Sequence, residues 1–489
     1  MPPPATPGPR PDGSCAFRDA DTGSSCESLA ANCGIDLAAF TFLNPIDCQD
    51  IQPNQRFCCS RGVKPTRAPK QLPNGGCFPY TVRDQDSCES LAASHDLTVA
   101  QIEQWNAGTF HWQGCGNLWT DTAMCLSPGT PPKPAIDPQA ECGPTSVGDK
   151  HCPLSLCCGP AGYCGSTPEF CAPATGFPCI YDCGMATIPT TDGSAFQRRV
   201  GYYTSWAASR AIKPVRPEDL ALAGYTHVNY AFAVITNGNL AFDSEEDAAV
   251  AQRLLARKKE FPSLKILISV GGWSFSEDDA TKMIFSQVFS SPGSRAQFIN
   301  SVNSFLGTWG FDGLDIDFEY PAAMERNGPI EDVKNLAAFW REARAGMRGN
   351  YLLTAALPAD AWFLKGYDIP SLRDNTDFLN LMSYDYHGPW DATSAGAWDP
   401  TAYMKANPQT SQLSIEASTL LYRKAGIPLE KVNLGIAFYG RNYKLSDPSC
   451  GHYGCGMTGA GAAGPASGEG ACVVPFTVPT CHSASVNSR

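Results

Sequence analysis

The fold is indicated most directly by one ten-residue segment, Phe311-Asp312-Gly313-Leu314-Asp315-Ile316-Asp317-Phe318-Glu319-Tyr320. Side chains two residues apart on a β-strand point to the same side. Asp315, Asp317 and Glu319 therefore share one face of a strand predicted over residues 313–319, and the apolar residues between them share the other. An apolar face of this kind packs against helices, which leaves the three carboxylates in a row that steps towards the C-terminal end of the strand.

The surrounding sequence repeats the same kind of strand. Apolar runs that become polar or aromatic at their C-terminal ends alternate with amphipathic helical stretches, as is typical of buried parallel strands. We predict strands over residues 200–204, 227–235, 265–270, 313–319, 351–356, 378–384 and 432–439, and helices over 248–261, 294–309, 333–347 and 414–425. Repeated β-α units favour a (β/α)8 TIM barrel, whose chemistry lies at the C-terminal strand ends. A doubly wound sheet is the alternative, but no glycine-rich phosphate loop supports it.

The row of carboxylates indicates acid catalysis. Three like charges in a partly buried row cannot all ionise at low cost, so at least one should keep its proton near neutral pH. The outermost, Glu319, can then be a general acid with a raised pKa. A solvated antiparallel strand and a site for a hard cation are the alternatives. One strand presents its carboxylates in a line rather than around a point, so we expect no metal and no cofactor.

Charge and cysteine usage bound the class of protein. The 489 residues include 36 Lys+Arg, 48 Asp+Glu and 22 cysteines. An acidic chain gains nothing from phosphate neutralisation, so nucleic acid is not expected as a partner, and the absence of an apolar run of 18 residues argues against a membrane span. The first residues contain no apolar segment, so no signal peptide is visible in this chain.

The cysteines fall into groups of even number: six over residues 15–59, four over 77–125, eight over 142–183 and four over 450–481. Even groups in short segments are typical of disulfide-stabilised modules in secreted proteins, so we expect an extracellular protein. Zinc binding is the alternative, but the Cys/His spacing fits no C-x-x-C pair of pairs.

Part of the N-terminal region is a duplication. Ser25-Cys26-Glu27-Ser28-Leu29-Ala30-Ala31 recurs 62 residues later as Ser87-Cys88-Glu89-Ser90-Leu91-Ala92-Ala93. Each copy is predicted as a strand, a helix after the Ser cap, a second helix ending at Asn44 or Asn106, and a final strand. We expect a Pro-rich segment over 1–13, modules over 14–62 and 76–128, and semi-extended linkers over 63–75 and 129–139.

The N-terminal modules resemble carbohydrate-binding families. The second copy resembles the LysM module and the first does so more weakly. Members of that family bind N-acetylglucosamine polymers in a groove between two loops. Residues 140–184 resemble the hevein-like chitin-binding module, whose framework is matched by Cys142, Cys152, Cys157, Cys158, Cys164, Cys171, Cys179 and Cys183. That resemblance implies that Tyr163 and Phe170 stack on sugar rings, although Ala161 stands where the family has a third aromatic residue.

Residues 198–489 resemble family 18 glycoside hydrolases. The carboxylate row matches the DxxDxDxE signature of that family. Further matches lie at the ends of other predicted strands, in the segments Gly201-Tyr202-Tyr203, Tyr230-Ala231-Phe232, Ser269-Val270-Gly271-Gly272-Trp273, Met382-Ser383-Tyr384-Asp385 and Phe438-Tyr439-Gly440-Arg441. The set of LysM, hevein-like and family 18 parts resembles a fungal, killer-toxin-like subgroup.

This resemblance implies an endochitinase-type enzyme with retaining, substrate-assisted catalysis. Glu319 would protonate the glycosidic oxygen, while the substrate's own acetamido oxygen attacks the anomeric carbon. Asp317 would hydrogen-bond the acetamido N–H, Asp315 would tune the charge of Asp317, Tyr384 would bind the acetamido carbonyl, and Asp385 would contact the sugar. The substrate-binding positions implied by the same motifs are Tyr202, Phe232, Trp273, Met382, Trp390 and Arg441.

The C-terminal part departs from the family pattern. After Tyr443 the family has an inserted α+β lobe and an eighth strand, whereas residues 472–489 look like neither. We therefore expect a barrel that lacks its eighth strand, and we expect this chain to be unstable or inactive. The alternatives to a chitinase are a chitin-binding lectin with an inactive barrel, and the binding subunit of a killer toxin with a small toxin-like partner chain. Chitin and its oligomers are the expected ligands of a monomeric protein, with bacterial peptidoglycan as an alternative LysM ligand.

Overall fold

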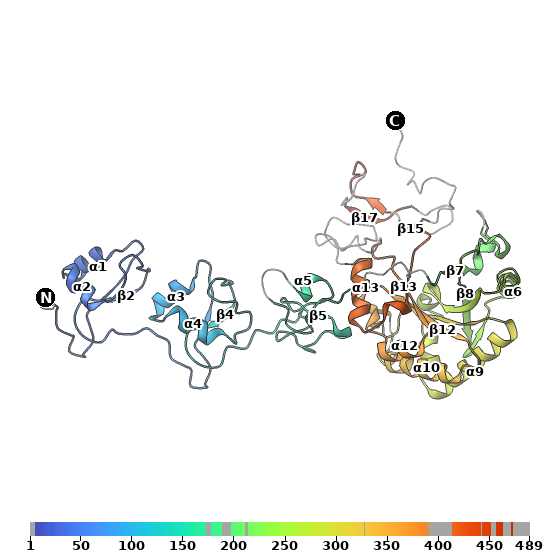
Figure 1. The fold of residues 1–489 in the computed structure, drawn as a ribbon, viewed down its shortest axis with the longest axis horizontal. Coiled ribbons are helices and arrows are strands. Elements are labelled where there is room, and N and C mark those ends of the chain that lie inside the picture. The colour runs from blue at the N-terminus through green and yellow to red at the C-terminus, as the bar shows by residue number, and fades with distance from the viewer. Residues whose placement is uncertain are drawn as a thin grey trace. The chain divides into compact units, whose positions relative to one another are not determined.

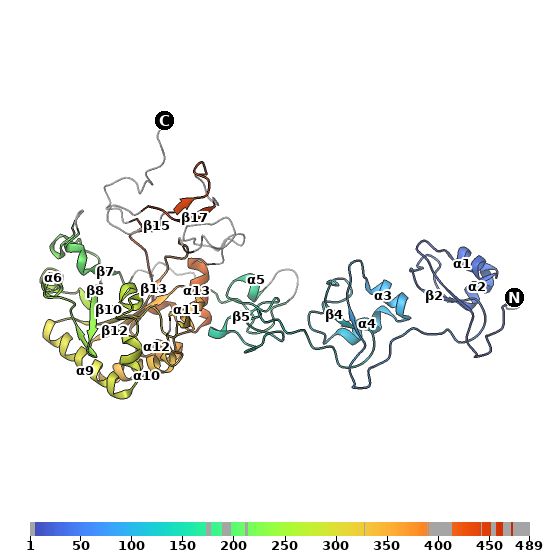
Figure 2. The ribbon, with the colours of Figure 1, turned by 180° about the vertical axis from the view of Figure 1, so that it is seen from behind.

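The computed structural model describes residues 5–172, 178–187, 197–210, 214–326, 328–388, 390, 413–441, 443–450, 456–462 and 471–472. The chain divides into two compact units, and Figures 1 and 2 show the ribbon from opposite sides. One consists of Met1–Lys150, Pro160–Tyr163 and Thr175–Pro178, and the other of the remaining residues. Because residues 140–184 contribute to both units, the units do not coincide with the modules predicted from the sequence.

The first unit contains the duplicated modules. Each has the predicted order of strand, helix, helix and strand, with its two strands paired antiparallel. The elements are β1 (Phe17–Asp19), α1 (Cys26–Cys33), α2 (Leu37–Leu43) and β2 (Arg56–Cys58), then β3 (Pro79–Thr81), α3 (Cys88–His95), α4 (Val99–Asn106) and β4 (Ala123–Cys125). Ser25 and Ser87 begin α1 and α3 as N-caps, as predicted, and each also forms a capping box with the serine three residues later.

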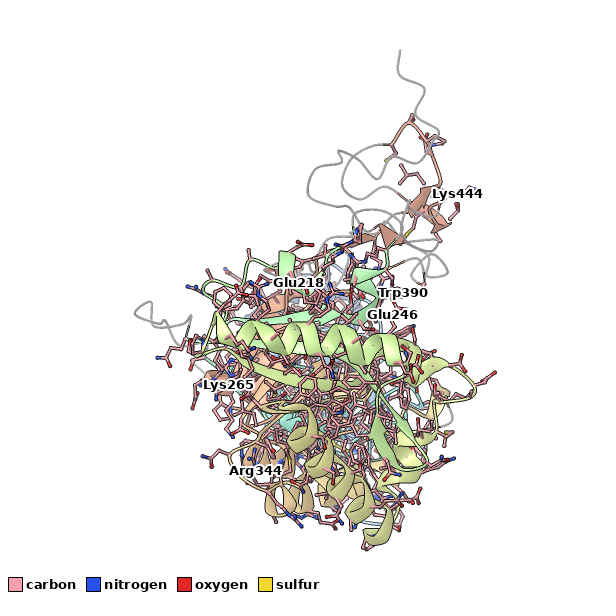
Figure 3. The ribbon with its side chains drawn as sticks, turned by 90° about the vertical axis from the view of Figure 1, so that its right-hand side faces the viewer. Glu218, Glu246, Lys265, Arg344, Trp390 and Lys444 are labelled. Atoms are coloured by element: carbon pink, nitrogen blue, oxygen red, sulfur yellow. A yellow bond between two sulfur atoms is a disulfide. The ribbon has the colours of Figure 1, made fainter. Side chains whose placement is uncertain are left out.

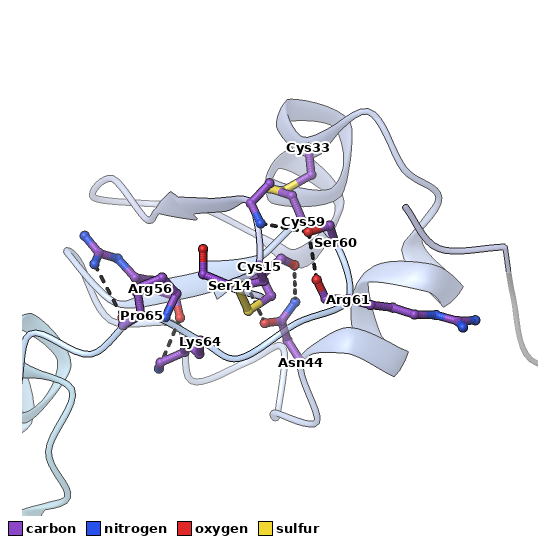
Figure 4. The surroundings of a disulfide bond; sticks show 12 residues. Ser14, Cys15, Cys33, Asn44, Arg56, Cys59, Ser60, Arg61, Lys64 and Pro65 are labelled. Atoms are coloured by element: carbon purple, nitrogen blue, oxygen red, sulfur yellow. Dashed lines mark hydrogen bonds between the residues drawn. A yellow bond between two sulfur atoms is a disulfide. The ribbon is translucent and has the colours of Figure 1, made fainter. Parts of the chain in front are cut away.

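An asparagine at the equivalent position of each module binds the final strand of that module. Asn44 donates to the Cys58 carbonyl (2.8 Å) and accepts from the Cys58 N–H (2.7 Å), and Asn106 makes the same pair with Cys125 (2.8 and 2.6 Å). Figure 4 shows Asn44 beside Cys15. The modules are stabilised further by the disulfides Cys15–Cys58, Cys26–Cys48, Cys33–Cys59, Cys77–Cys125 and Cys88–Cys115. The disulfide framework predicted from the cysteine grouping is confirmed here.

The second unit begins with small elements around the cysteine-rich segment. They are β5 (Cys157–Cys158), β6 (Cys164–Gly165) and α5 (Pro168–Cys171), and β5 pairs antiparallel with β6. Disulfides join Cys152 to Cys164, Cys157 to Cys171 and Cys179 to Cys183.

A curled parallel sheet forms the main body of the second unit. Its strand order is β14-β13-β12-β11-β10-β8-β7, with the short β9 (Asn239–Ala241) paired antiparallel to β8. The strands are β7 (Val200–Thr204), β8 (His227–Thr236), β10 (Lys265–Gly271), β11 (Gly313–Asp317), β12 (Leu352–Pro358), β13 (Phe378–Met382) and β14 (Val432–Leu434). Arg198, just before β7, donates to Asn433 of β14 (3.1 Å), so the sheet curls until its two outer strands approach each other. The described residues contain seven of the eight strands of a (β/α)8 barrel, which confirms the predicted fold class.

Helices cover the outside of the sheet. The longer ones are α6 (Glu245–Ala256), α9 (Pro292–Trp309), α10 (Asp332–Gly346), α12 (Ile369–Asn375) and α13 (Ile415–Lys424). Helices α9, α10 and α12 lie side by side (Figures 1 and 2). None of the helices in the described ranges is long and apolar enough to cross a bilayer.

The apolar face of β11 packs against this helical layer, as predicted. Leu314, Ile316 and Phe318 are buried, and the Phe318 ring stacks on Phe285 of α8 (Ile284–Phe289) at 4.7 Å between centroids. β11 ends at Asp317, two residues earlier than predicted. The chain leaves the sheet there because the Glu319 N–H donates to the Ser276 hydroxyl (3.1 Å) rather than to a strand carbonyl.

Candidate active site

Asp315 is the fully buried inner member of the carboxylate row. Its two oxygens accept hydrogen bonds from Thr354 (2.5 Å), Ser269 (2.8 Å), Tyr202 (2.9 Å) and Asn380 (3.3 Å). Burial raises the pKa of Asp315, and these four hydrogen bonds oppose that rise. Four donors from four other strands thus hold one carboxylate inside the barrel.

Asp317 lies one step further out in a different environment. It is buried, yet its Oδ1 accepts no hydrogen bond from the described residues. Burial, Glu319 and Asp315 together raise the pKa of Asp317 well above its usual range. An unoccupied acceptor beside a second carboxyl can receive a donor from a bound ligand.

Glu319 is the outermost carboxyl and is only 8% exposed. Burial raises the pKa of Glu319 to about 7; the Arg326 cation opposes the rise, and Asp385 and Glu277 add to it. A carboxyl with a pKa near neutral can hold a proton and still release it, which is what a general acid requires. Arg326 also donates to the Glu319 carbonyl (2.9 Å) and pairs with Glu277 (2.7 Å), so it fixes the backbone beneath the acid.

A second cluster follows β13 at the same end of the barrel. Asp385 accepts from the Tyr439 hydroxyl (2.5 Å) and from two nitrogens of Arg441 (2.8 and 2.5 Å). The Tyr384 ring lies 6.2 Å from that of Tyr439, and burial and the carboxylates raise the pKa of Tyr384. The Tyr384 hydroxyl therefore keeps its proton near neutral pH and can donate a hydrogen bond close to the carboxylates.

The aromatic residues predicted from the motifs line this end of the barrel. Figure 3 labels Trp390, which follows β13, and it lies at the opposite end of the barrel from Lys265 at the start of β10. Arg441 lies over the Trp390 ring (5.2 Å), and Arg326 lies over the Trp273 ring (4.6 Å). Both indoles are more than half exposed.

The other predicted substrate positions are more enclosed. The Phe232 ring covers Gly272, where a Cβ atom would come within 2.7 Å of it. Met382 ends β13 and is partly buried, and Tyr202 directs its hydroxyl inwards to Asp315. The structure therefore brings Asp315, Asp317, Glu319, Tyr384 and Asp385 to one end of the barrel together with the six predicted substrate positions.

Tyr163 and Phe170 belong to the cysteine-rich segment and are no part of this cluster. Tyr163 is exposed, whereas Phe170 is partly buried over Gly165. Tyr163 is therefore more available than Phe170 for stacking on a sugar ring.

Sequence reasoning missed several residues that shape the site: Ser276, Arg326, Thr354, Asn380 and Tyr439. Thr354 and Asn380 could have been found, because each is a polar residue at an inward position of an otherwise apolar strand. Arg326 lies in a loop with no periodic pattern, so no sequence signal pointed to it.

Three models of known protein families match parts of the chain. The model of Glycosyl hydrolases family 18 matches residues 198–470, the Chitin recognition protein model matches 141–183, and the LysM domain model matches 22–59 and 80–110. These matches confirm the three resemblances inferred from the sequence.

Individual curated relatives match most of the length of this chain. "Secreted chitinase LysM12" of Penicillium expansum is 32% identical over 91% of this chain and 31% of its own length. "Killer toxin subunits alpha/beta" of Kluyveromyces lactis is 30% identical over 91% of this chain and 38% of its own length. The chain thus spans about a third of the length of these curated relatives.

A solved structure matches the barrel. The Group IV chitinase of Ostrinia furnacalis, crystallised in complex with allosamidin, is 31% identical over 56% of this chain and 74% of its own, with a TM-score of 0.50. More than half of the chain matches the family model, and the carboxylate row lies at the strand ends where a (β/α)8 barrel places its chemistry. The chain therefore belongs to family 18 of the glycosyl hydrolases.

Proposed function

We propose that this chain is a chitinase, which hydrolyses β-1,4 linkages between N-acetylglucosamine units with retention of configuration. The observation that carries the proposal is the row Asp315, Asp317 and Glu319, in which burial raises the pKa of the outermost carboxyl, Glu319, to about 7. Two alternatives fit this row of carboxylates less well. A metallohydrolase would need its carboxylates arranged around a metal ion rather than along a strand. A lectin would not need a carboxyl group with a pKa near neutral.

The proposed mechanism assigns one role to each side chain. Glu319 gives its proton to the glycosidic oxygen as the bond to the anomeric carbon breaks. The acetamido oxygen of the substrate attacks that carbon from the other face, so no protein carboxylate becomes the nucleophile. The free Oδ1 of Asp317 accepts the acetamido N–H and stabilises the positive charge that develops on the ring formed. Glu319, now deprotonated, then removes a proton from a water molecule whose oxygen bonds to the anomeric carbon, while the bond between that carbon and the acetamido oxygen breaks and the original configuration is restored.

Supporting roles follow from the contacts. Asp315 is held by its four donors and sets the charge next to Asp317. The Tyr384 hydroxyl binds the acetamido carbonyl, and Asp385, fixed by Arg441, contacts a sugar hydroxyl. The open faces of Trp273 and Trp390 stack on sugar rings, and Tyr202, Phe232 and Met382 complete the wall.

We further propose that the protein is secreted and monomeric and that it acts on chitin and its oligomers. The disulfides of the N-terminal modules and the relative named a secreted chitinase support this location. The modules are assigned to residues 14–62, 76–128 and 140–184, and the barrel to residues 198–489.

Glu319→Gln tests the function directly. It removes the proton while keeping the size of the side chain, so release of soluble oligomers from colloidal chitin should fall by about a thousandfold. Binding to chitin, measured by sedimentation, should stay unchanged because the N-terminal modules are intact. Equal release by both chains would disprove the assignment of the acid.

A second function is favoured by the 30% identity with the killer toxin subunits over 91% of this chain. In that case the chain would bind chitin on a target cell and carry a small partner chain. Binding to chitin without oligomer release by the wild-type chain, with a second polypeptide that co-purifies, would favour it over the chitinase.

A further inference from the structure

The turn that follows β11 contacts two exposed tryptophans, Trp273 and Trp362. This turn, η6 (Met324–Arg326), comes seven residues after the end of β11. Arg326 lies over the ring of Trp273, as described above, and the neighbouring Glu325 accepts a hydrogen bond from the indole N–H of Trp362 (2.9 Å). Two consecutive side chains, Glu325 and Arg326, therefore each contact one exposed indole.

Trp362 lies at the mouth of the barrel. It belongs to α11 (Ala361–Leu364), which begins just after the C-terminal end of β12. The next residue, Phe363, stacks on Tyr320 at 4.2 Å between centroids, and Tyr320 directly follows Glu319. Trp362 thus directly precedes Phe363, whose ring contacts the residue that follows Glu319.

The indole of Trp362 is held rigidly and yet is open. The Lys365 ammonium lies 3.6 Å from its ring centroid and so covers one face. The residue is nevertheless 59% exposed, so more than half of it remains open to solvent. Burying a large apolar ring is favourable, so a rigid indole with an open face is suited to receive a flat apolar partner.

We propose that Trp362 is a sugar-stacking platform. It binds an N-acetylglucosamine unit of the polysaccharide substrate at a position remote from the bond that is cleaved. This inference rests on the proposed function. The axial C–H groups of a pyranose make an apolar, slightly positive face, which matches the π-face of an indole. Glu325 and Lys365 act as positioning residues, because they fix the plane of the ring before the sugar arrives.

Kinetics on soluble oligomers of increasing length test the platform. In Trp362→Ala, kcat/KM on the hexamer should fall about tenfold, while kcat/KM on a short substrate such as 4-nitrophenyl chitobioside should stay within twofold of wild type. Trp362→Phe should keep most of the hexamer activity. Met324→Ala is the matched control, since Met324 is an exposed apolar residue of the same turn with no flat face.

Three results would overturn the proposal: equal loss on short and long substrates, equal loss in Met324→Ala and Trp362→Ala, or no loss on the hexamer. Glu325→Gln keeps an oxygen acceptor for the indole and should behave as wild type. Glu325→Ala should lose part of the hexamer preference without a change in activity on the short substrate.

A readout without activity separates this inference from the proposed function. The chain has ten tryptophans, and labelling of Glu319→Gln with 5-fluorotryptophan gives each a 19F resonance. The Trp362 resonance is identified by its absence in the Trp362→Phe chain. It should shift on addition of hexamer but not of dimer, even if the wild-type chain hydrolyses nothing. An unshifted Trp362 resonance at saturating hexamer would refute the platform.

Discussion

Arg326 combines a charge and a scaffold directly behind the proposed acid. Its cation lowers the pKa of Glu319, while burial raises it. The charge can be removed with little change in side-chain length by Arg326→Gln, and Arg326→Lys keeps the charge but loses the planar guanidinium.

Replacement of Arg326 by Gln should shift the pH dependence of catalysis. The acid works only while protonated, so kcat/KM falls on the alkaline side as the coupled pair Asp317 and Glu319 loses its last proton. The wild-type alkaline limb should have an apparent pKa of about 7. Without the cation the pKa of Glu319 rises, so the limb should move to higher pH. Arg326→Lys should leave the limb in place, and a limb that moves to lower pH in Arg326→Gln would contradict the assignment.

We expect the Asp317 carboxylate to lower the free energy of unfolding of the barrel while it is needed for catalysis. A carboxyl whose pKa is higher in the folded than in the unfolded chain binds more protons when folded, so the free energy of unfolding falls as pH rises above about 3.9. The raised pKa of Asp317 has this sign. Asp317→Asn should therefore raise the Tm of the barrel by a few degrees at pH 8 and much less at pH 4, while activity falls at least a hundredfold.

Asp315→Asn is the matched comparison on the same face of β11. Both oxygens of Asp315 accept hydrogen bonds, and an amide nitrogen in place of one oxygen leaves buried donors facing a donor. Its Tm should therefore fall at pH 4 and at pH 8. Scanning calorimetry on the two variants measures both effects, and a lower Tm for Asp317→Asn at pH 8 would show that the charge of Asp317 is compensated in the folded chain.

At the scale of elements, the sequence predicted strands well and their ends less well. Alternation along residues 313–317 places the carboxylates on one face because the period of a strand leaves no other arrangement. Glu319, however, lies beyond the strand, since the partner of its N–H is the Ser276 hydroxyl from α7 (Trp273–Glu277), and no local pattern encodes that contact. β14 ends at Leu434, five residues before the predicted end, where its three-residue pairing with β13 stops.

The candidate site divides in the same way. Residues that follow a strand directly, such as Trp273 and Asp385, could be predicted, because the topology of a parallel barrel brings all strand ends to one mouth. Arg326 lies over Trp273, and Trp362 donates a hydrogen bond to Glu325. These residues lie on short turns and helices whose positions depend on tertiary packing, so their contacts could not be predicted. Long-range contacts of this kind are fixed by tertiary packing rather than by local sequence.

At the scale of the whole molecule, covalent and non-covalent stability are segregated along the chain. The sequence has no cysteine between Gly184 and Ser449, so the seven strands and their helices rely on an apolar core. The N-terminal modules have small cores, such as that around Leu91 and Ile102, and are cross-linked by disulfides. Loss of a native disulfide from a small secreted domain costs about 2–5 kcal/mol, which is comparable to the stability that such a domain possesses.

Reduction should therefore separate binding from hydrolysis. With millimolar dithiothreitol, the modules should unfold and adsorption to colloidal chitin should be lost, while kcat/KM on a short soluble substrate should remain within twofold. Cys88→Ser/Cys115→Ser should weaken adsorption selectively without any reductant, because it opens a cross-link of the second module alone. Cys450 is also disulfide-bonded and lies beyond β14. If hydrolysis of the soluble substrate falls in parallel with adsorption, the barrel depends on the cross-link at Cys450 as well as on the seven parallel strands that the structure describes.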